Sequence, residues 1–415
     1  MSFEAPLAAA DIIQWLYGEA VEVQDSQELV RHLGQRLREA RIPVDRISTG
    51  IALLHPNVRA ESALWTSDGH TELRRYMEAP DLQASYDRSP LKVVYVEGRS
   101  VRIRVTPEPE EGEYGILPEL RDGGFKDYIA MPLPFSDGTN KALTLATRSE
   151  AGFTPAHLAV FESIARPLGL ICELNTLRRT ASTLLDTYVG PRAGSRVLQG
   201  SIKRGGGELI SAVISFADLR GFTTLSNRLP GEKLIELLNT YFGAMASAVE
   251  AQGGEVLKFI GDEVMAIFPY ESADEAQEAS RRAVLAAQEA VMRIAEVNRN
   301  CCAETPAINV SIALHAGDVF FGNVGSETRL DFTVVGPAVN LASRIAGLAK
   351  ALDREILASE TVAGMLGCQS GKVGTYYVKG FDEPVSVFSP PLDRSPCAAS
   401  PCSDAMTAVR AFDAN

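Results

Sequence analysis

The strongest constraint on the fold is the order of apolar and amphipathic segments between residues 209 and 324. The run 209–216 is short and rich in apolar residues, which predicts a buried strand. It is followed by a segment with apolar residues at helical spacing, which begins at Pro230-Gly231 and ends at a pair of glycines. Two short apolar runs then flank Gly261-Asp262, a dipeptide that suits a two-residue hairpin turn. The chain is therefore predicted to form a strand, a helix and a hairpin in that order.

A second helix and a further pair of strands are predicted to follow the hairpin. Ser272 and Glu275 form a capping box at the start of a long alanine-rich helix. The run 308–315 alternates apolar and polar residues, which predicts a half-buried strand, and Gly317-Asp318 is then expected to turn the chain back. The resulting order matches the βαββαβ arrangement of ferredoxin-like folds, so the predicted class is α+β.

The region before residue 208 also combines predicted strands with helices. Pro155 follows Thr154, an arrangement typical of a helix start. The segment 126–170 resembles the closing half of a GAF domain, a small-ligand or dimerisation module. The resemblance implies an α+β GAF-like sensor domain that takes a small-molecule ligand, while a PAS-like fold or a spacer without a ligand is the alternative. Strands are predicted at 47–54, 92–96, 100–105, 128–133 and 142–147.

These signals divide the chain into five parts. Residues 391–415 hold prolines, serines and alanines without periodicity, and we expect them to be a disordered tail. The predicted linker helix carries one apolar stripe, formed by Leu177, Leu184, Leu185 and Tyr188. This stripe could pair with a second copy of the chain or pack on its own domain. The other four parts are an N-terminal segment (1–25), the GAF-like regulatory domain (26–175), the helical linker (176–207) and a second domain (208–390).

Composition argues against several classes of function. The formal net charge of −13 repels phosphate backbones, so no nucleic-acid partner is expected. No apolar run approaches the roughly 18 to 20 residues of a membrane helix, and the N-terminus lacks the basic region of a signal peptide. The expected location is therefore cytoplasmic. The six cysteines lack the spacing of zinc sites, and we expect them to be reduced and non-catalytic.

Two aspartates stand where predicted strands end. Asp218 follows the first strand, and Asp262 lies at the tip of the hairpin. In a ferredoxin-like sheet these strands are neighbours, so the two carboxylates could meet and hold divalent cations through hard oxygen ligands. Two turn-forming aspartates without a metal are the alternative. Further along, Asn340 and Arg344 lie four residues apart on one helical face, where they could address a phosphate together.

Four segments together resemble the catalytic domain of class III nucleotide cyclases, over roughly residues 209 to 390: FADLRGFT, EVLKFIGDEVMAIF, ALHAGDVFFGNVG and DFTVVGPAVNLASR. The resemblance implies that Asp218 and Asp262 bind two Mg²⁺ or Mn²⁺ ions per site, with the Leu219 carbonyl as an extra ligand. It also implies that Asn340 and Arg344 orient the ribose and stabilise the transition-state phosphate.

The resemblance extends to the substrate. Lys258 matches the family's purine-reading lysine, and its ammonium can only donate, which suits N1 of adenine and not the N1–H of guanine. Thr333 stands where many adenylyl cyclases have aspartate. Its hydroxyl can donate as well as accept, so we expect weaker discrimination between ATP and GTP than with aspartate. A threonine here resembles the subgroup associated with bicarbonate stimulation. Lys379 stands near the position of the family's second triphosphate-binding cation, and His315 is expected to be structural rather than a general base.

The expected function is an adenylate cyclase of signal transduction, which converts ATP into 3′,5′-cyclic AMP and pyrophosphate. The family forms head-to-tail dimers, so the resemblance implies a homodimer with two active sites at the interface. One chain would supply the metal-binding aspartates and the other the base- and phosphate-binding residues. A guanylate or mixed-specificity cyclase is one alternative, and a nucleotide-binding regulatory subunit without catalysis is another.

Overall fold

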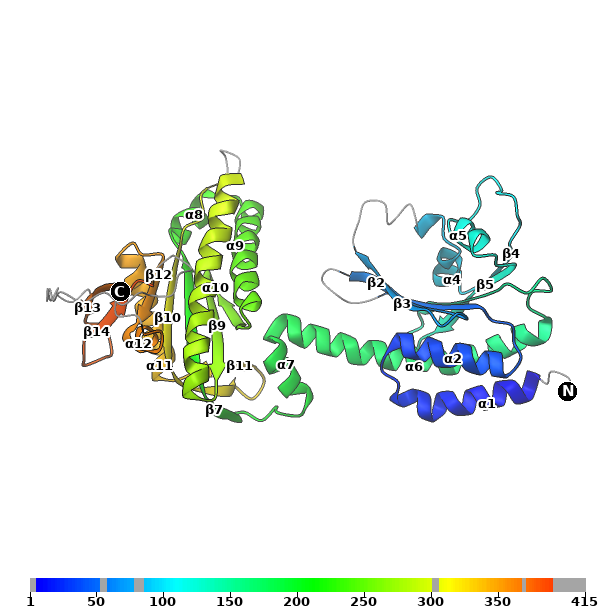
Figure 1. Cartoon of the computed structure of the whole chain (residues 1–415), viewed down its shortest axis with the longest axis horizontal. Helices are drawn as coiled ribbons and strands as arrows, with labels where there is room; N and C mark the ends of the chain where they lie inside the picture. The colour runs from blue at the N-terminus through cyan, green and yellow to red at the C-terminus, as the bar shows by residue number, and fades with distance from the viewer. Residues whose placement is uncertain (1–4, 53–57, 78–85, 301–305, 368–370, 391–415) are drawn as a thin grey trace. The chain divides into compact units, whose positions relative to one another are not determined.

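The computed structural model of this protein describes residues 5–52, 58–77, 86–300, 306–367 and 371–390. It divides into two compact units, Met1–Leu184 and Leu185–Asn415 (Figure 1). Within the described residues, no helix combines the length and the apolar character needed to cross a membrane. Cys172 is buried as a free thiol, whereas the other five cysteines and the predicted tail lie outside the described residues.

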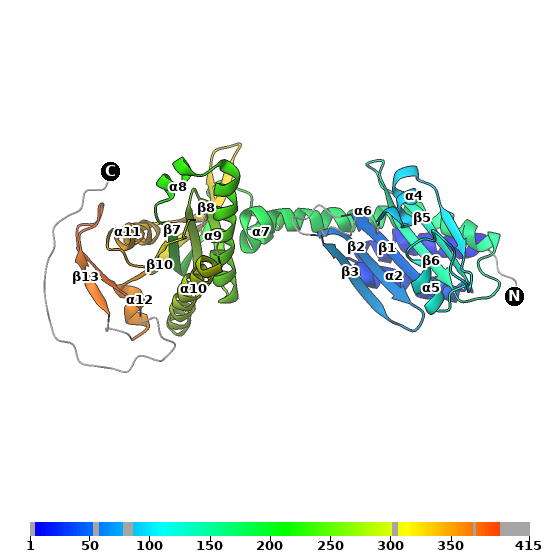
Figure 2. The same cartoon turned by 90° about the horizontal axis from the view of Figure 1, so that it is seen from above.

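The first unit is built on a six-stranded antiparallel sheet (Figure 2). Its strand order is β3-β2-β1-β6-β5-β4, so that β1 and β6, far apart in the sequence, pair at its centre. Strands β2 and β3, which the sequence analysis does not identify, form a hairpin at one edge. The strands are β1 (Arg46–Ala52), β2 (Val58–Thr66), β3 (Thr71–Met77), β4 (Val101–Arg104), β5 (Asp127–Pro134) and β6 (Asn140–Thr147).

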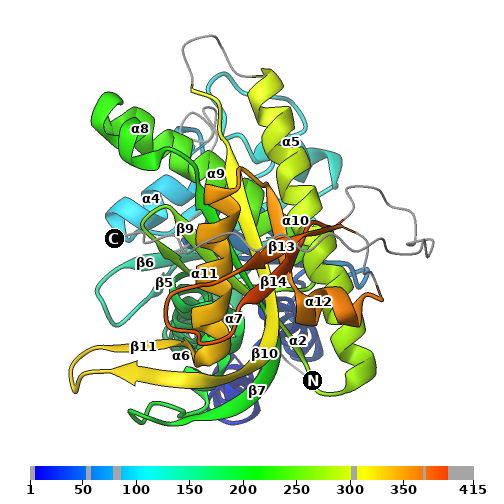
Figure 3. The ribbon, with the colours of Figure 1, turned by 90° about the vertical axis from the view of Figure 1, so that its left-hand side faces the viewer.

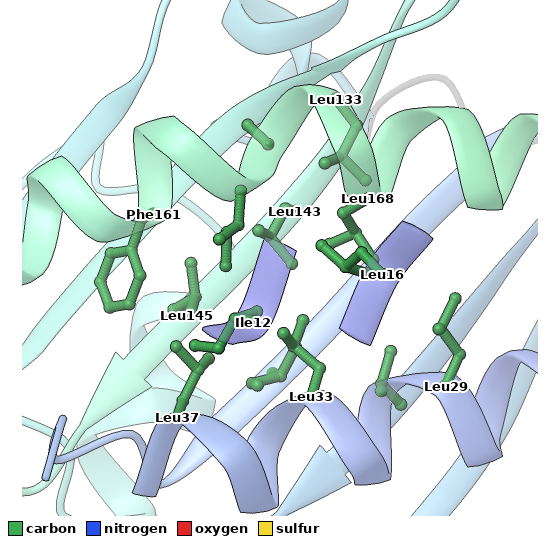
Figure 4. Packing of buried hydrophobic residues seen from close by; sticks show 14 of the residues in the cluster. Ile12, Leu16, Leu29, Leu33, Leu37, Leu133, Leu143, Leu145, Phe161 and Leu168 are labelled. Carbon is green, nitrogen blue, oxygen red and sulfur yellow. The ribbon is translucent and has the colours of Figure 1, made fainter. Parts of the chain in front are cut away.

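Three helices share one core with this sheet. In α2 (Ser26–Glu39), Leu29, Leu33 and Leu37 recur at every fourth position and are fully or almost fully buried. They pack with Ile12 and Leu16 of α1 (Ala5–Tyr17) and with the first half of α6 (Pro155–Val189), as Figure 4 shows. The 3₁₀ turn η1 (Glu19–Glu22) joins α1 to α2. Helix α1 lies in the predicted N-terminal segment, and it contributes to the core of this unit.

The helix predicted after Thr154 begins as expected and then runs through much of the predicted linker. The Thr154 hydroxyl accepts a hydrogen bond from the backbone N–H of His157 at 3.2 Å, which caps the first turn of α6. The helix ends at Val189, and α7 (Pro191–Leu198) follows after Gly190. Within the apolar stripe, Leu177 is 60% exposed and Tyr188 is 82% exposed. These two side chains do not pack in a core, so pairing of the stripe with a second copy stays a prediction.

The strand predicted at 92–96 is wrong, because these residues form helix α4 (Leu91–Glu97). The Ser89 hydroxyl accepts a hydrogen bond from the backbone N–H of Leu91 at 3.2 Å. At the other end, Gly98 adopts φ +64° and closes the helix with a left-handed residue. The valines of this run favour a strand by composition, but the Ser89 hydrogen bond before them and the left-handed Gly98 after them enclose a helix. Helices α4 and α5 (Leu117–Asp122) pack on the sheet face opposite α2.

The second unit contains an eight-stranded sheet. Strands β10, β7, β9 and β8 are neighbours in that order, and each pair is antiparallel. This order is that of a ferredoxin-like βαββαβ fold, so the predicted α+β class is confirmed. The strands are β7 (Gly207–Leu219), β8 (Glu255–Ile260), β9 (Glu263–Tyr270), β10 (Val310–Gly325), β11 (Leu330–Val335), β12 (Ile356–Ser359), β13 (Lys372–Tyr376) and β14 (Val385–Phe388).

Helices cover both faces of this sheet. Alternate residues of a strand point to opposite sides, so Val213 and Ala217 of β7 pack toward α9 and α10, whereas Ile214 and Phe216 pack toward α11. Helices α9 and α10 lie side by side (Figure 1), and α11 lies against β10 (Figure 3). The helices are α8 (Phe222–Arg228), α9 (Gly231–Ala251), α10 (Ala273–Asn300), α11 (Pro337–Ala351) and α12 (Glu360–Met365).

The predicted turn at Gly317-Asp318 is also wrong. Strand β10 continues through both residues and stays paired with β7, with Asp318 opposite Ser211. A Cβ added at Gly317 would lie 2.8 Å from the Cβ of Ala338 in α11. Glycine is needed here because a helix packs closely on the strand, and not because the chain turns. The reversal occurs instead between Gly325 and Leu330.

This explanation predicts that Gly317→Ala destabilises the protein. The new methyl group would push α11 away from β10, at a cost of about 1 to 3 kcal/mol, because overpacking a filled interface forces backbone shifts. Gly243→Ala is the matched control, since a Cβ at that helical position meets nothing within 4 Å. It should be neutral or raise stability by about 0.5 to 1 kcal/mol. Calorimetric unfolding of the full chain measures both variants, and an unchanged Gly317→Ala would contradict the packing role.

Candidate functional site

The structure brings the two predicted metal-binding aspartates to neighbouring strand ends. Asp218 is near the end of β7, where it faces Glu263 of β9 in the strand register. Asp262 precedes Glu263 in the β8–β9 turn, where Gly261 adopts φ +64°. Only glycine takes this backbone conformation without strain, which explains the Gly-Asp pair at the tip. The Leu219 side chain is fully buried and has no atom that could bind a metal, so only the backbone carbonyl of this residue could serve an ion.

Burial and mutual repulsion make this group of carboxylates electrostatically unfavourable without a cation. Burial raises the pKa of Asp262, and the negative charge of Asp218 raises it further. Burial raises the pKa of Glu263 to about 7, with the charges of Asp218 and Asp262 adding to the effect. A divalent cation would relieve this repulsion, and carboxylate oxygens are the ligands that Mg²⁺ prefers. The donor set therefore fits Mg²⁺ or Mn²⁺.

The protein alone does not complete a metal-binding shell. Among the residues that the structure describes, no three Asp, Glu, His or Cys side chains are arranged to hold an ion. Mg²⁺ is commonly bound through one or two carboxylates, with waters and substrate phosphates completing its octahedron. Asp218 and Asp262 fit that mode of binding, in which the substrate supplies part of the shell.

Lys350 is the one cation that contacts these carboxylates in the described part of the chain, and the sequence analysis does not find it. Its Nζ lies 2.9 Å from Oδ1 and 3.3 Å from Oδ2 of Asp218. Side chains alternate along β7, and Asp218 lies two and four residues after Phe216 and Ile214. Its side chain therefore points to the same side of the sheet as theirs, the side that α11 covers. A lysine in the last turn of a helix is an ordinary helix-dipole residue, so no sequence signal marks this contact.

Tyr241 is a second residue that sequence reasoning misses. Its side chain is fully buried in α9, and its hydroxyl has no hydrogen-bond partner among the described residues. Burial raises the pKa of this phenol, and the charges of Asp218, Asp262 and Glu263 raise it further. The hydroxyl therefore stays protonated and lies within the field of the acidic group.

Asn340 and Arg344 share the exposed face of α11, as predicted. Neither side chain forms a hydrogen bond or ion pair with another described residue. Asn340 lies ten residues before Lys350, which is about 15 Å along a helix that rises 1.5 Å per residue. Since Lys350 is the α11 residue that contacts Asp218, the structure does not bring Asn340 to the carboxylates of the same chain.

The two predicted base-reading residues lie on different strands. Lys258, on β8, forms an ion pair with Asp331 of β11, with 2.6 Å between Nζ and Oδ2. Thr333, also on β11, is 5% exposed, and its hydroxyl has no partner among the described residues. Lys379 is exposed between β13 and β14, in the half of the sheet beyond β10, and the structure does not place it beside the other residues. Asp331 is a residue that the sequence analysis overlooks, although it lies two positions from Thr333.

Comparison with known proteins identifies the family of this domain. Residues 208–388 match the family model of the adenylate and guanylate cyclase catalytic domain. This segment is a class III nucleotide cyclase domain. The match includes the strand ends at Asp218 and Asp262 and the face of α11 that carries Asn340 and Arg344.

The relatives of the cyclase domain include enzymes named for either nucleotide. An adenylate cyclase of Anabaena cylindrica is 35% identical over 182 residues, which cover 42% of this chain and 36% of that protein. The chain thus spans about a third of the length of this relative. The solved structure of the adenylyl cyclase CyaB from P. aeruginosa is 27% identical in sequence and has a TM-score of 0.40. The similarity covers 46% of this chain and 100% of that one. The solved structure of the guanylyl cyclase Cya2 is 32% identical in sequence and has a TM-score of 0.39. The similarity covers 44% of this chain and 92% of that one.

His315 occupies a structural position in the cyclase domain. Its side chain is buried, and its Nδ1 lies 2.9 Å from the Ser359 hydroxyl. It lies four residues along β10 from Ser311, the residue opposite Asp218, which is about 13 Å at the rise of a strand. Burial lowers the pKa of His315 to about 4, so the imidazole is neutral near pH 7.

Acid is therefore predicted to destabilise the cyclase domain through His315. The pKa is about 4 when folded and 6.5 when unfolded, so the unfolded chain takes up this proton first as the pH falls. The stability that neutral His315 provides is complete above pH 6.5 and is lost between pH 6.5 and 4, by about 2 kcal/mol at pH 5. His315→Gln should lose less stability than the wild type between pH 7.5 and 5, as measured by calorimetry. Exposed His70 supplies the control His70→Gln, and equal losses in His315→Gln and wild type would contradict this prediction.

Proposed function

We propose that this protein is an adenylate cyclase that forms 3′,5′-cyclic AMP and pyrophosphate from ATP. The observation that carries the proposal is the pair of carboxylates, Asp218 and Asp262, at adjacent strand ends of a cyclase domain. The buried Thr333 hydroxyl, which has no partner among the described residues, and the free exposed face of α11 support it. Each of these groups is suited to a ligand that the chain itself does not supply.

Asp218 and Asp262 would hold Mg²⁺ or Mn²⁺, with the Leu219 carbonyl as a further oxygen ligand. Two such ions, when bound, favour ionisation of the ribose 3′-hydroxyl and neutralise charge on the triphosphate. The residues of the chain place that hydroxyl in line with the α-phosphorus, so that the ring closes as pyrophosphate leaves. Lys350 must release the Asp218 carboxylate before that carboxylate can serve as a ligand, because an ammonium and a metal ion compete for the same oxygens.

Asn340 and Arg344 would act on the sugar and the reacting phosphate. The guanidinium of Arg344 can donate two hydrogen bonds to phosphate oxygens, and it stabilises the charge that develops during transfer. The amide of Asn340, one helical turn away, can donate to or accept from the ribose. Lys379 is proposed to contribute a further positive charge to the triphosphate.

A homodimer would complete the site. Asn340 lies about 15 Å along α11 from the residue that contacts Asp218, which supports a site in which the α11 face of one chain meets the carboxylates of another. A head-to-tail pair of chains would set the carboxylates of one copy against the α11 face of the other and create two equivalent sites. The exposed stripe residues Leu177 and Tyr188 are available to support such a pair.

Lys258 and Thr333 favour ATP over GTP. The ammonium of Lys258 donates to N1 of adenine, whereas guanine presents a donor at that position. The Thr333 hydroxyl can accept from the adenine amino group, but it can also donate to O6 of guanine. That dual capacity is the observation that favours the second candidate, a cyclase of mixed specificity. Stimulation by bicarbonate is a further hypothesis, which unchanged activity at fixed pH would contradict.

The first unit is proposed to be a GAF-like regulatory domain. Its antiparallel sheet, with helices on both faces, supports a sensor-type α+β fold. Helix α6 begins in the core of this unit and continues past it, so a change in the unit can act on the helix directly.

The first test of the proposal is an assay of the purified full chain. With Mn²⁺ or Mg²⁺ it should convert ATP to cyclic AMP, and GTP much less. Asp218→Asn should lower kcat by about 100-fold or more, because it removes a charged ligand from the reaction centre. Asp274→Asn, which removes an exposed acid at the start of α10, is the control and should keep full activity. Binding without turnover would instead support a regulatory subunit, and preferred turnover of GTP a guanylate cyclase.

Mixing inactive variants tests whether sites are shared between chains. Asp218→Asn and Asn340→Ala chains should recover activity together, because each mixed dimer has one intact site. Asp218→Asn mixed with Asp262→Asn should recover none, since both changes affect the same half of the site. The readout is cyclic AMP formation after exchange of differently tagged chains has been verified. Equal recovery in both mixtures, or in neither, would contradict the shared site.

A further inference from the structure

The contact between Lys350 and Asp218 places a mobile cation beside a proposed metal ligand. Lys350 Nζ lies 2.9 Å from Oδ1 and 3.3 Å from Oδ2 of Asp218, its ion-pair partner in the described part of the chain. The positive charge of Lys350 also opposes the rise in the pKa of Asp262 and of Glu263. The ammonium therefore acts on all three carboxylates and occupies a position that a bound ion would need.

The backbone of Lys350 is held firmly in place at the end of α11. Ala349, the residue before it, is fully buried in the core beneath this helix. Asp353, with a left-handed φ of +52°, donates from its backbone N–H to the carbonyl of Lys350 at 3.3 Å. The Asp353 carboxylate pairs with Arg220, whose Nε donates to the Ser311 hydroxyl at 2.7 Å. The end of α11 thus stays attached to β10 and to the end of β7, whatever the Lys350 side chain does.

The side chain of Lys350 is free to change partners. It is 48% exposed, and its ammonium is carried by a flexible four-carbon stem. When Asp218 serves as a metal ligand, the ammonium loses that carboxylate, because both cations need the same oxygens. Since the backbone is anchored, the released ammonium remains close to the carboxylates. Phosphate oxygens of the substrate commonly complete the shell of an ion held by one or two carboxylates, so phosphates would lie within its reach.

We propose that Lys350 is a phosphate-binding residue, which exchanges the Asp218 carboxylate for the β- and γ-phosphates of the nucleotide. This inference rests on the proposed nucleotide cyclase function. Lysine binds phosphate well as a point charge, and the terminal phosphates replace the negative charge that Lys350 loses with Asp218. Lys350 lies beside the carboxylates of its own chain, whereas the structure does not place Lys379 there. Lys350 would thus neutralise the empty site and bind substrate in the loaded one.

The exchange predicts opposite effects of Lys350→Met on two ligands. Without nucleotide, the variant should bind Mn²⁺ about 2- to 5-fold more tightly, because the competing ammonium is gone. At saturating Mn²⁺, the Kd for 3′-deoxy-ATP, which lacks the attacking hydroxyl, should rise about 10-fold, because a charged hydrogen bond to phosphate is lost. The Kd for AMP, which lacks both terminal phosphates, should not change.

Two further variants control for charge and for unrelated effects. Lys350→Arg keeps the positive charge and should retain most of the affinity for 3′-deoxy-ATP. Lys126→Met removes a lysine that pairs with Glu150 at 3.0 Å on the first unit, and it should change neither Kd. All three variants should fold, because ion pairs this accessible contribute little to stability. Electron paramagnetic resonance of Mn²⁺ and calorimetric titration of the nucleotides measure binding to the full chain.

Three results would overturn the proposal. Tighter Mn²⁺ binding with an unchanged Kd for 3′-deoxy-ATP would mean that Lys350 only competes with the ion. An equal loss of affinity for 3′-deoxy-ATP and AMP would place Lys350 away from the terminal phosphates. Unchanged Mn²⁺ affinity would contradict the exchange itself.

Failure of the proposed function would look different. In that case the wild type would form no cyclic nucleotide from ATP or GTP. Neither binding measurement needs turnover, so the opposite shifts in Lys350→Met would still establish the role of this residue. Normal turnover in the wild type without those shifts would leave the cyclase function intact and overturn the role of Lys350. A wild type that binds neither Mn²⁺ nor 3′-deoxy-ATP would overturn both.

Discussion

The pairing of β7 with a strand on each side is the interaction on which the cyclase domain depends. Its register with β9 sets Asp218 opposite Glu263, and its register with β10 sets Asp218 opposite Ser311. Side chains alternate with a period of two, so a slip of one residue would turn Asp218 to the opposite face. The buried residues of β7 prevent such a slip, because it would also move Ile214 and Phe216 out from under α11. The position of the carboxylate is thus a by-product of core packing.

Electrostatic strain at that position gives the site its chemistry. Burial and the proximity of like charges raise the pKa values of Asp262 and Glu263, and Lys350 offsets part of the negative charge from α11. Burial and mutual repulsion destabilise the ionised form of these carboxylates, so the group is well suited to bind a metal cation. Groups with perturbed pKa values are common at functional sites. The same logic applies to Thr333, whose buried hydroxyl finds no partner among the described residues. A buried polar group without a partner in the fold is costly until a ligand or a change of packing supplies that partner.

Much of the cyclase fold follows from local sequence pattern. The wrong predictions of secondary structure come from residue types that suit two different local structures. Gly261 and Gly317 both precede aspartate, yet the first adopts φ +64° in a turn and the second makes room for Ala338 within a continuous strand. A dipeptide cannot distinguish these uses, because the second depends on a helix that lies later in the chain. The run 92–96 is ambiguous for a similar reason: its valines favour a strand, but the Ser89 hydrogen bond before it and the left-handed Gly98 after it enclose helix α4.

The sequence by itself determined the order of strands β7 to β10 with helices α9 and α10 between them, the ferredoxin-like class and the residues of the four motifs, but not the course of β10 through Gly317-Asp318. These depend on periodicity and on spacing within one or two elements, which a linear chain displays directly. Only the tertiary structure revealed that Lys350 contacts Asp218 and that Asp331 holds Lys258, contacts that span 132 and 73 residues. The reason is physical: each contact is made where a helix packs on a sheet or where a hairpin reaches across to another strand. Such approaches are set by the packing of whole elements, and no local pattern records them.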